Sequence, residues 1–139
     1  MATVCAGTMA LLDAGVPMIR PVAGISTGLV TEQDADGNMT KHVVILDIIG
    51  SEDFYGDMDF KLCGTSEGVT GYQLDLKLPG IPLSILEEGI DLALEGRGDV
   101  LAKMAESITG PGELSPYAPR IETVTIPQDR IGELIGPGG

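Results

Sequence analysis

Two apolar, β-branched stretches read VAGISTGLV (residues 22–30) and HVVILDI (residues 42–48), and the polar cluster DADGN (residues 34–38) lies between them. β-branched residues favour strands, and clusters of Asp, Gly and Asn favour tight turns. These three segments therefore predict a β-hairpin.

A second pair of strands is predicted over residues 59–64 and 70–78, joined by the turn Thr65-Ser-Glu-Gly68. In the second of them Tyr72, Leu74, Leu76 and Leu78 alternate with Gln73, Asp75 and Lys77. This period of two predicts one buried and one solvated face. Between the two pairs, residues 50–56 contain Gly, Ser and acidic residues and are expected to form a polar loop.

Helices are predicted on both sides of these strands. Residues 2–14 carry apolar side chains at the helical period, and Gly15 followed by Val16-Pro17 is a helix stop. A second helical region begins near Pro82 and continues through Gly96-Arg97-Gly98 to about Ile108. Strands between two helical regions predict an α+β fold, with a mixed sheet packed against helices.

The C-terminal part of the chain has a different composition. Residues 109–120 contain three prolines and two glycines, which is typical of a linker. After it, Ile121, Val124 and Ile126 suggest a short strand, and residues 128–135 a short helix followed by Gly136-Pro-Gly-Gly139. The sequence thus divides into a first domain over residues 1–108, a linker over 109–120 and the start of another domain over 121–139.

Composition excludes some classes of protein. With 43% apolar and 21% charged residues, the chain is too apolar for a disordered acidic tail. No apolar run approaches the roughly 18 residues of a membrane-spanning helix, and the first nineteen residues lack the basic start of a signal peptide. The net charge of -13 repels polyanions and by itself argues against nucleic-acid binding. Cys5 and Cys63 fit a reducing compartment, each as a small core residue.

One cluster of side chains could carry chemistry. Asp53, Asp57, Asp59 and Lys61 lie within nine residues, and Asp57, Asp59 and Lys61 would share one face of a strand. Mg²⁺ is commonly held by one or two carboxylates, and a lysine beside it can neutralise charge on a transferring phosphoryl group. A solvated acidic loop with a surface salt bridge fits the same residues, and the pattern alone favours that alternative because such clusters are common.

Two other candidates are weaker. His42 has no nearby Cys or His companion, so we interpret it as a hydrogen-bonded residue of an edge strand. The glycines at positions 136, 138 and 139 fit either an amide cradle for a backbone phosphate or a simple turn.

Several segments together resemble polynucleotide phosphorylase, the family of phosphate-dependent 3′-to-5′ exoribonucleases. They run through nearly the whole chain and read LLDAGVP (11–17), PVAGI (21–25), GDMDFK (56–61), ELSPYAPRI (113–121) and IGPGG (135–139). The strings DMDFK and SPYAPR are the most specific of them.

The resemblance implies a fold and a set of site residues. Residues 1–108 are similar to the C-terminal part of the second RNase PH-like core (ribosomal protein S5 domain 2-like), and residues 121–139 to the truncated start of a KH domain. Asp53, Asp59 and Lys61 correspond to the family's catalytic residues, with Asp53 and Asp59 as metal ligands, while Asp57 is expected to have a structural or second-sphere role. Gly136, Pro137, Gly138 and Gly139 correspond to the RNA-binding loop of the KH domain.

Further expectations follow from the same resemblance. The family's serine-rich phosphate-binding turn would precede Met1, so only the helix N-terminus at Ala2-Thr3-Val4 would face the phosphate. The stretch from Thr31 to Lys41 is longer than this hairpin needs, and its tip is expected to be an insertion without catalytic consequence.

The implied activity is degradation of single-stranded RNA by phosphorolysis, releasing nucleoside 5′-diphosphates, with Mg²⁺ as cofactor and Mn²⁺ as its substitute. The implied partners are RNA, inorganic phosphate, two further copies in a homotrimer and other proteins of an RNA-degrading complex, with no membrane. We expect a cytoplasmic location, an organellar source being left open, and no activity of these residues in isolation. Two alternatives remain at this point: an RNase PH-type enzyme that trims RNA ends, and a noncatalytic RNA-binding ring subunit.

Overall fold

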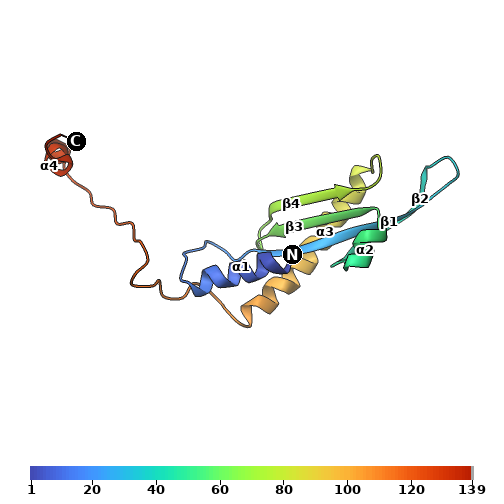
Figure 1. The fold of residues 1–139 in the computed structure, drawn as a ribbon, viewed down its shortest axis with the longest axis horizontal. Coiled ribbons are helices and arrows are strands. Elements are labelled where there is room, and N and C mark those ends of the chain that lie inside the picture. The colour runs from blue at the N-terminus through green and yellow to red at the C-terminus, as the bar shows by residue number, and fades with distance from the viewer. Residues whose placement is uncertain (139) are drawn as a thin grey trace.

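The computed structural model describes residues 1–138 and has an α+β fold. Figure 1 shows one four-stranded sheet with helices on both sides and a C-terminal segment that leads away from it. The strand order is β2-β1-β3-β4, and every neighbouring pair is antiparallel. The prediction of a mixed sheet was wrong. The sheet consists of two hairpins, and the connection between them reverses the chain once more. All the strand pairs formed by residues 1–138 are therefore antiparallel.

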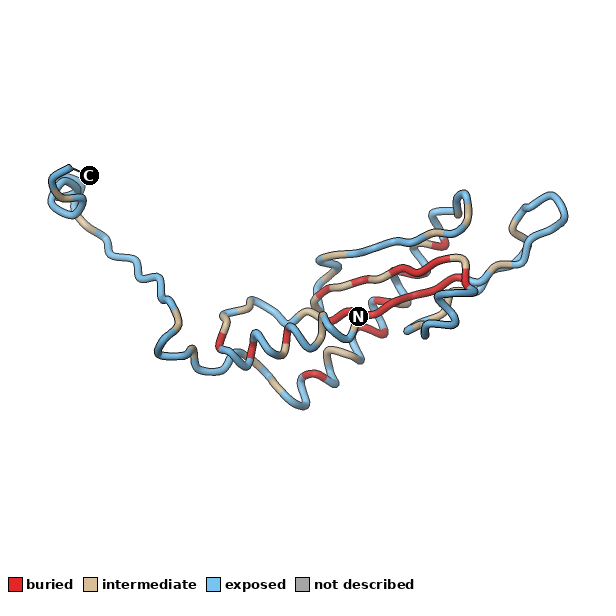
Figure 2. The backbone as a smooth tube through the Cα atoms, in the orientation of Figure 1, coloured by how far each residue is buried: buried red, intermediate tan, exposed pale blue. Residues whose placement is uncertain are grey.

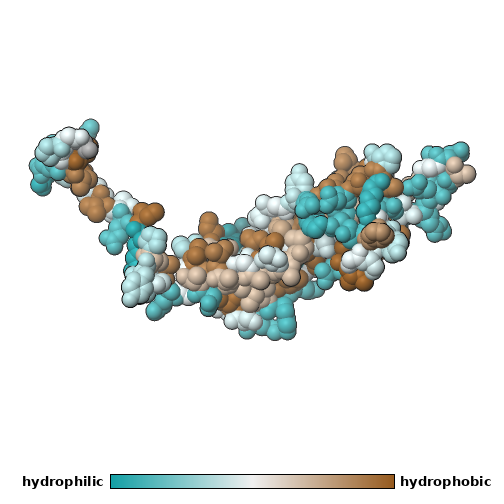
Figure 3. Space-filling model, in the orientation of Figure 1, coloured by the Kyte–Doolittle hydropathy of each residue, from teal (hydrophilic) through white to brown (hydrophobic). Residues whose placement is uncertain are grey.

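The first hairpin is formed by β1 (Ala23–Gln33) and β2 (Met39–Leu46), as predicted. Its turn is organised by Asp34, whose Oδ1 accepts hydrogen bonds from the backbone N–H groups of Asp36 and Asn38 at 3.0 and 2.8 Å. Hydrogen bonds from Asn38 lower the pKa of Asp34. The tip projects beyond the sheet, and Figure 3 shows that it is hydrophilic.

The core lies between α3 (Leu83–Ala105) and one face of the sheet. The longest buried stretches in Figure 2 follow β1 and β3, where Leu29 and Met58 are fully buried. Gly96 lets α3 approach the sheet, because a Cβ there would lie 2.6 Å from Cδ2 of Leu46. The helix continues through Gly96-Arg97-Gly98 as predicted, but it ends at Ala105, three residues before the expected Ile108.

The opposite face of the sheet is covered in part by α1 (Ala2–Asp13). Gly15 ends this helix with a φ of +77°, a conformation that costs glycine little, and Val16 N–H donates to the Leu11 carbonyl at 3.0 Å. Cys5 packs against β1, where Gly24 N–H donates to its Sγ at 3.4 Å. Cys5 and Cys63 are both free thiols.

Two local predictions were wrong in this part of the chain. Residues 50–56 are not a loop: Gly50–Tyr55 form helix α2, which begins where the Ile49 N–H donates to the Glu52 carboxylate at 2.8 Å. The hairpin of β3 (Met58–Gly64) and β4 (Val69–Leu76) forms as predicted, but β4 has no buried face. Tyr72 is 75% exposed, because β4 is an edge strand and α3 packs mainly on β1 and β2.

The C-terminal segment has little regular structure. The predicted strand over residues 121–126 does not form, because no other segment pairs with it among the described residues. The short helix expected over residues 128–135 is present as a 3-10 turn, η1 (Gln128–Arg130), followed by α4 (Ile131–Ile135). The segment that follows α3 is attached to α1, since Gly112 N–H donates to the Leu12 carbonyl at 2.8 Å.

Candidate active site

Asp59 and Lys61 project from β3 on the face opposite α3, as the alternation along this strand predicts. Asp59 is only 4% exposed, and its Oδ2 accepts a hydrogen bond from Lys61 Nζ. Its other oxygen, Oδ1, is buried without a hydrogen-bond partner among the described residues. A buried carboxylate oxygen without a donor is costly, so this atom is a strong candidate for a ligand-binding group.

A glycine opposite Asp59 makes room for the segment that carries Asp53. Gly28 is the β1 partner of Asp59, and a Cβ at Gly28 would lie 2.7 Å from Cγ2 of Ile48. Ile48 lies two residues before α2, so the lack of a side chain at Gly28 lets the chain close over the strand there. In the sequence this glycine is only one residue of a predicted strand, because its close contact depends on tertiary packing.

Asp53 lies on α2, and Lys77 holds this helix against the end of β4. Lys77 Nζ donates to the backbone carbonyls of Asp53 and Phe54, and it lies 3.8 Å from Asp53 Oδ1. The Asp53 side chain is about half exposed at 51%. Its carboxylate is therefore accessible from solvent and already has a cation near it.

The electrostatics of the site centre on Lys61. The hydrogen bond to Asp59 raises the pKa of Lys61, and the charges of Asp59, Asp75 and Asp53 raise it further, although burial acts in the opposite direction. Asp53 and Asp59, the two carboxylates predicted to hold a metal, thus act on the same ammonium group. Asp75 was predicted only as a residue on the solvated face of its strand, and its place beside Lys61 was not predicted.

Asp57 does not join this group, although its spacing suggested that it would project together with Asp59 and Lys61. Its Oδ2 accepts hydrogen bonds from the backbone N–H and the hydroxyl of Thr31, both at 2.8 Å. Asp57 lies one residue before β3 begins, and its carboxylate bonds to β1 beyond Leu29 and Met58, the last residue pair of the two strands. This contact gives Asp57 a structural role, in agreement with the expectation from the resemblance.

The residues fit a divalent cation with few protein ligands. Among residues 1–138, no three or more His, Cys, Asp or Glu side chains converge as a metal-binding group. Mg²⁺ does not need such a group, because it is often bound through one or two carboxylates, water and substrate phosphates. The unpartnered Oδ1 of Asp59 supplies the kind of hard oxygen donor that this ion prefers.

A hollow of about 350 Å³ lies beside Lys61. It is lined by Met1 and Val4 at the start of α1, by Lys61 and Cys63 of β3, and by Gly71, Tyr72 and Gln73 of β4. The N-terminal end of α1 therefore shares a cavity with the candidate catalytic lysine. Helix N-termini and a lysine ammonium group both attract anions, whereas most of the other residues that line the hollow are apolar.

Comparison with known proteins places the chain in a family. It is 74% identical over its whole length to a polyribonucleotide nucleotidyltransferase of Akkermansia muciniphila. The proteins of the same name from Opitutus terrae and Treponema denticola are 54% and 52% identical over the whole chain. The chain belongs to the polyribonucleotide nucleotidyltransferase family. It spans about a fifth of the length of these relatives. No family model matches it.

The polyribonucleotide nucleotidyltransferase family is the one that the sequence motifs resemble, so that identification is confirmed. The names of these relatives do not favour either alternative, the RNase PH-type trimming enzyme or the noncatalytic ring subunit. Within the described residues, none of the helices has the length and apolar character that a membrane crossing requires.

The other candidate residues make no hydrogen bond or ion pair to Asp53 or Asp59 among the described residues. His42 Nε2 lies 2.9 Å from Glu88 Oε2 of α3, so it is the hydrogen-bonded edge-strand residue that we predicted. In the C-terminal loop, Gly136 and Gly138 have φ angles of +75° and +86°, with Pro137 between them, whereas Gly139 lies outside the described residues. The expected role of this loop in RNA binding stays a prediction.

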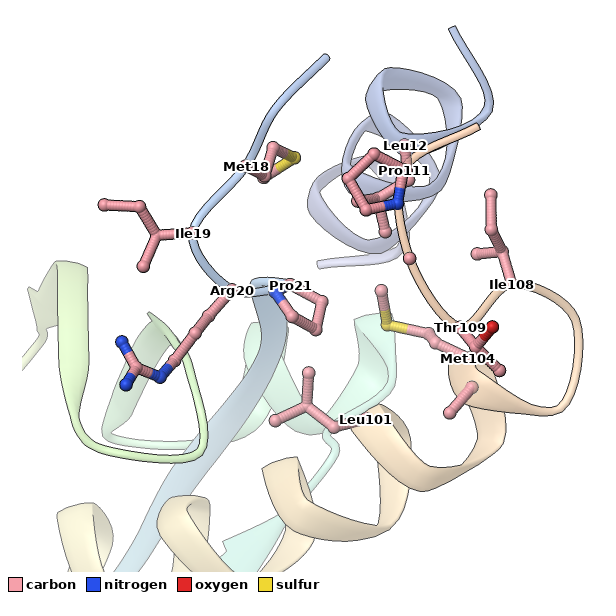
Figure 4. Close-up of a pocket in the computed structure, with 12 residues that line it drawn as sticks. Leu12, Met18, Ile19, Arg20, Pro21, Leu101, Met104, Ile108, Thr109 and Pro111 are labelled. Carbon is pink, nitrogen blue, oxygen red and sulfur yellow. The ribbon is translucent and has the colours of Figure 1, made fainter. Parts of the chain in front are cut away.

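An apolar cavity of about 140 Å³ lies between the C-terminal ends of α1 and α3 (Figure 4). Leu12, Leu101 and Met104 line it together with the segment over residues 18–21. Arg20 lies at its edge and pairs with Glu67. The cavity has no carboxylate or other candidate catalytic group, so it is not part of the active site.

Proposed function

We propose that this segment supplies catalytic residues to a phosphate-dependent 3′-to-5′ exoribonuclease. In the reaction, an oxygen of inorganic phosphate attacks the phosphorus of the 3′-terminal phosphodiester. The bond from this phosphorus to the preceding 3′ oxygen breaks, and that oxygen takes up a proton. A nucleoside 5′-diphosphate and an RNA shortened by one nucleotide are released, and the reverse reaction polymerises diphosphates.

The observation that carries this proposal is the buried Asp59, with one oxygen bonded to Lys61 and the other without a partner in residues 1–138. In the proposed site Asp59 and Asp53 hold Mg²⁺, with Mn²⁺ as a substitute. The ion supplies positive charge to the phosphate oxygens. Lys61 offsets the charge that develops on the phosphoryl group, and the hollow beside it receives the phosphate near the start of α1.

The remaining expectations belong to the same proposal. Residues 1–108 are assigned to an RNase PH-like core and residues 121–139 to the start of a KH domain, whose loop Gly136-Pro-Gly-Gly139 contacts single-stranded RNA. The positive φ angles of Gly136 and Gly138 support a tight loop of this kind. We further infer a homotrimer, partners in an RNA-degrading complex and a cytoplasmic location where RNA is available.

The metal site is tested in a full-length chimaera, made by placing this 139-residue segment in the matching position of the Akkermansia muciniphila relative. Release of nucleoside diphosphate from RNA is measured at saturating phosphate. Asp59→Asn and Asp53→Asn should each lower the rate at least about 100-fold, because several kcal/mol of transition-state stabilisation depend on the metal.

The matched control is Asp36→Asn at the exposed hairpin tip, which removes the same charge far from the site and should leave the rate unchanged. If Asp59→Asn turned RNA over as fast as the parent chimaera, the assignment of the metal site would be wrong.

The 139-residue chain alone should neither release nucleoside diphosphate nor bind RNA tightly. Positioning provides most of the catalysis of phosphoryl transfer, and the relatives are about five times longer than this chain. A net charge of -13 also provides no counterion release on RNA binding. Titration with a short single-stranded RNA at micromolar protein should show no saturable binding, and tight, salt-sensitive binding would contradict this division of roles.

A further inference from the structure

Two carboxylates face each other across the β3–β4 ladder of the candidate site. Asp59 and Asp75 are directly paired residues, so their side chains project on the same face. Like charges in this arrangement repel, and Asp59 is almost fully buried. A cation between the two carboxylates relieves this repulsion.

Lys61 is that cation. Its Nζ donates to Asp59 Oδ2 and lies 3.9 Å from Asp75 Oδ2. The two partners differ in environment, because the Asp59 side chain is 6% exposed and the Asp75 side chain 59%. One ammonium group therefore lies between a buried and a solvated carboxylate.

The Asp75 side chain is held in place by a hydrogen bond from the neighbouring residue pair of the β3–β4 ladder. Gln73, which is the β4 partner of Lys61, donates a hydrogen bond from Nε2 to Asp75 Oδ2 at 2.8 Å. Asp53 is the third acid whose charge acts on Lys61, and its Oδ1 lies 3.8 Å from Nζ of another lysine, Lys77. Asp75 is thus the carboxylate besides Asp59 that lies within ion-pair distance of Lys61 among the described residues.

We propose that Asp75 is a positioning residue for Lys61. When Asp59 binds the divalent cation, the ammonium group of Lys61 moves to the carboxylate of Asp75. This inference rests on the proposed function of Asp59. A cation at Asp59 competes with Lys61 for the carboxylate, and two positive charges close together repel. Asp75 offers Lys61 a second partner on the same face, so the lysine stays beside the reacting phosphate and Asp59 becomes free for the ion.

The proposal predicts a coupling between Asp75 and Lys61 that is visible in metal binding alone. Mn²⁺ affinity is measured by calorimetry on the full-length chimaera, without RNA or phosphate, for the parent, Asp75→Asn, Lys61→Gln and the double variant. Asp75→Asn should weaken Mn²⁺ binding roughly fivefold when Lys61 is present, a size typical of coupled neighbours, and should have no effect when it is absent. Asp75→Glu should restore the affinity of the parent.

Asp91→Asn is the control for net charge, since Asp91 is exposed on α3. If Asp75→Asn weakened Mn²⁺ binding equally with Lys61 and with Lys61→Gln, Asp75 would act on the ion directly. If it weakened Mn²⁺ binding in neither, Asp75 would have no influence on Lys61. Either result overturns the inference. Asp59→Asn separates this inference from the proposed function, because unchanged Mn²⁺ affinity in that variant would refute the metal site itself.

Discussion

Asp57 and Asp59 are two residues apart, yet they should respond very differently to substitution. Both hydrogen bonds that Asp57 accepts from Thr31 are 2.8 Å long, and both residues are half-buried. Hydrogen bonds to charged groups contribute about 1.5–3 kcal/mol each when buried, so with partial solvent access Asp57→Ala should lower the free energy of unfolding by about 2–3 kcal/mol. Asp57→Asn keeps an oxygen acceptor without the charge and should cost about half as much.

The assay is urea unfolding of the 139-residue chain, followed by far-ultraviolet circular dichroism. Asp36→Ala is the control, because Asp36 is exposed at the hairpin tip, and its effect should stay within about 0.5 kcal/mol. In the full-length chimaera, Asp57→Asn should retain most of the phosphorolysis rate that Asp59→Asn loses. The reasoning is refuted if Asp57→Ala is as mild as Asp36→Ala, or if Asp57→Asn and Asp59→Asn abolish the activity equally.

Further predictions concern the packing of the chain and the Cys63 thiol. Leu29→Ala, at a fully buried position, should cost about 3 kcal/mol in urea unfolding, whereas Val43→Ala, at a position 59% exposed, should cost under about 1 kcal/mol. Gly15→Ala should cost roughly 1–2 kcal/mol, because φ is +77° there and a Cβ would lie 2.6 Å from the backbone nitrogen of Leu114. Burial raises the pKa of the Cys63 thiol above its ordinary value of 9.0, so its alkylation by iodoacetamide at pH 8 should be slower than that of a cysteine peptide. The unfolded thiol loses its proton first, and the free energy of unfolding should therefore fall as the pH rises above 9.0, which urea titrations at several pH values would measure.

Local sequence signals were sufficient for much of the fold. The turn residues of the first hairpin, the glycine stop after α1 and the helical period of α3 each act within a few residues. The alternation that placed Asp59 and Lys61 on one strand face is equally local. The resemblance to polynucleotide phosphorylase then gave these two residues and Asp53 a function that spacing alone did not favour.

Other features depended on contacts between distant segments. β4 has the alternation of a half-buried strand, but its exposure depends on which strands α3 covers. Residues 121–126 have the composition of a strand, but a strand also needs a partner. The helix α2 escaped prediction because its start depends on a side chain that reaches back to the Ile49 backbone.

The sequence by itself determined the two hairpins, the two long helices and the shared strand face of Asp59 and Lys61, because the period of an element reports the side on which each residue lies. Only the tertiary structure brought Asp75 opposite Asp59, separated Asp57 from the site and closed the chain over Gly28. These contacts arise from strand register and from the close packing of segments 20 or more residues apart in sequence, as for Gly28 and Ile48. The periodicity of one strand contains no information about which residue its neighbour places opposite.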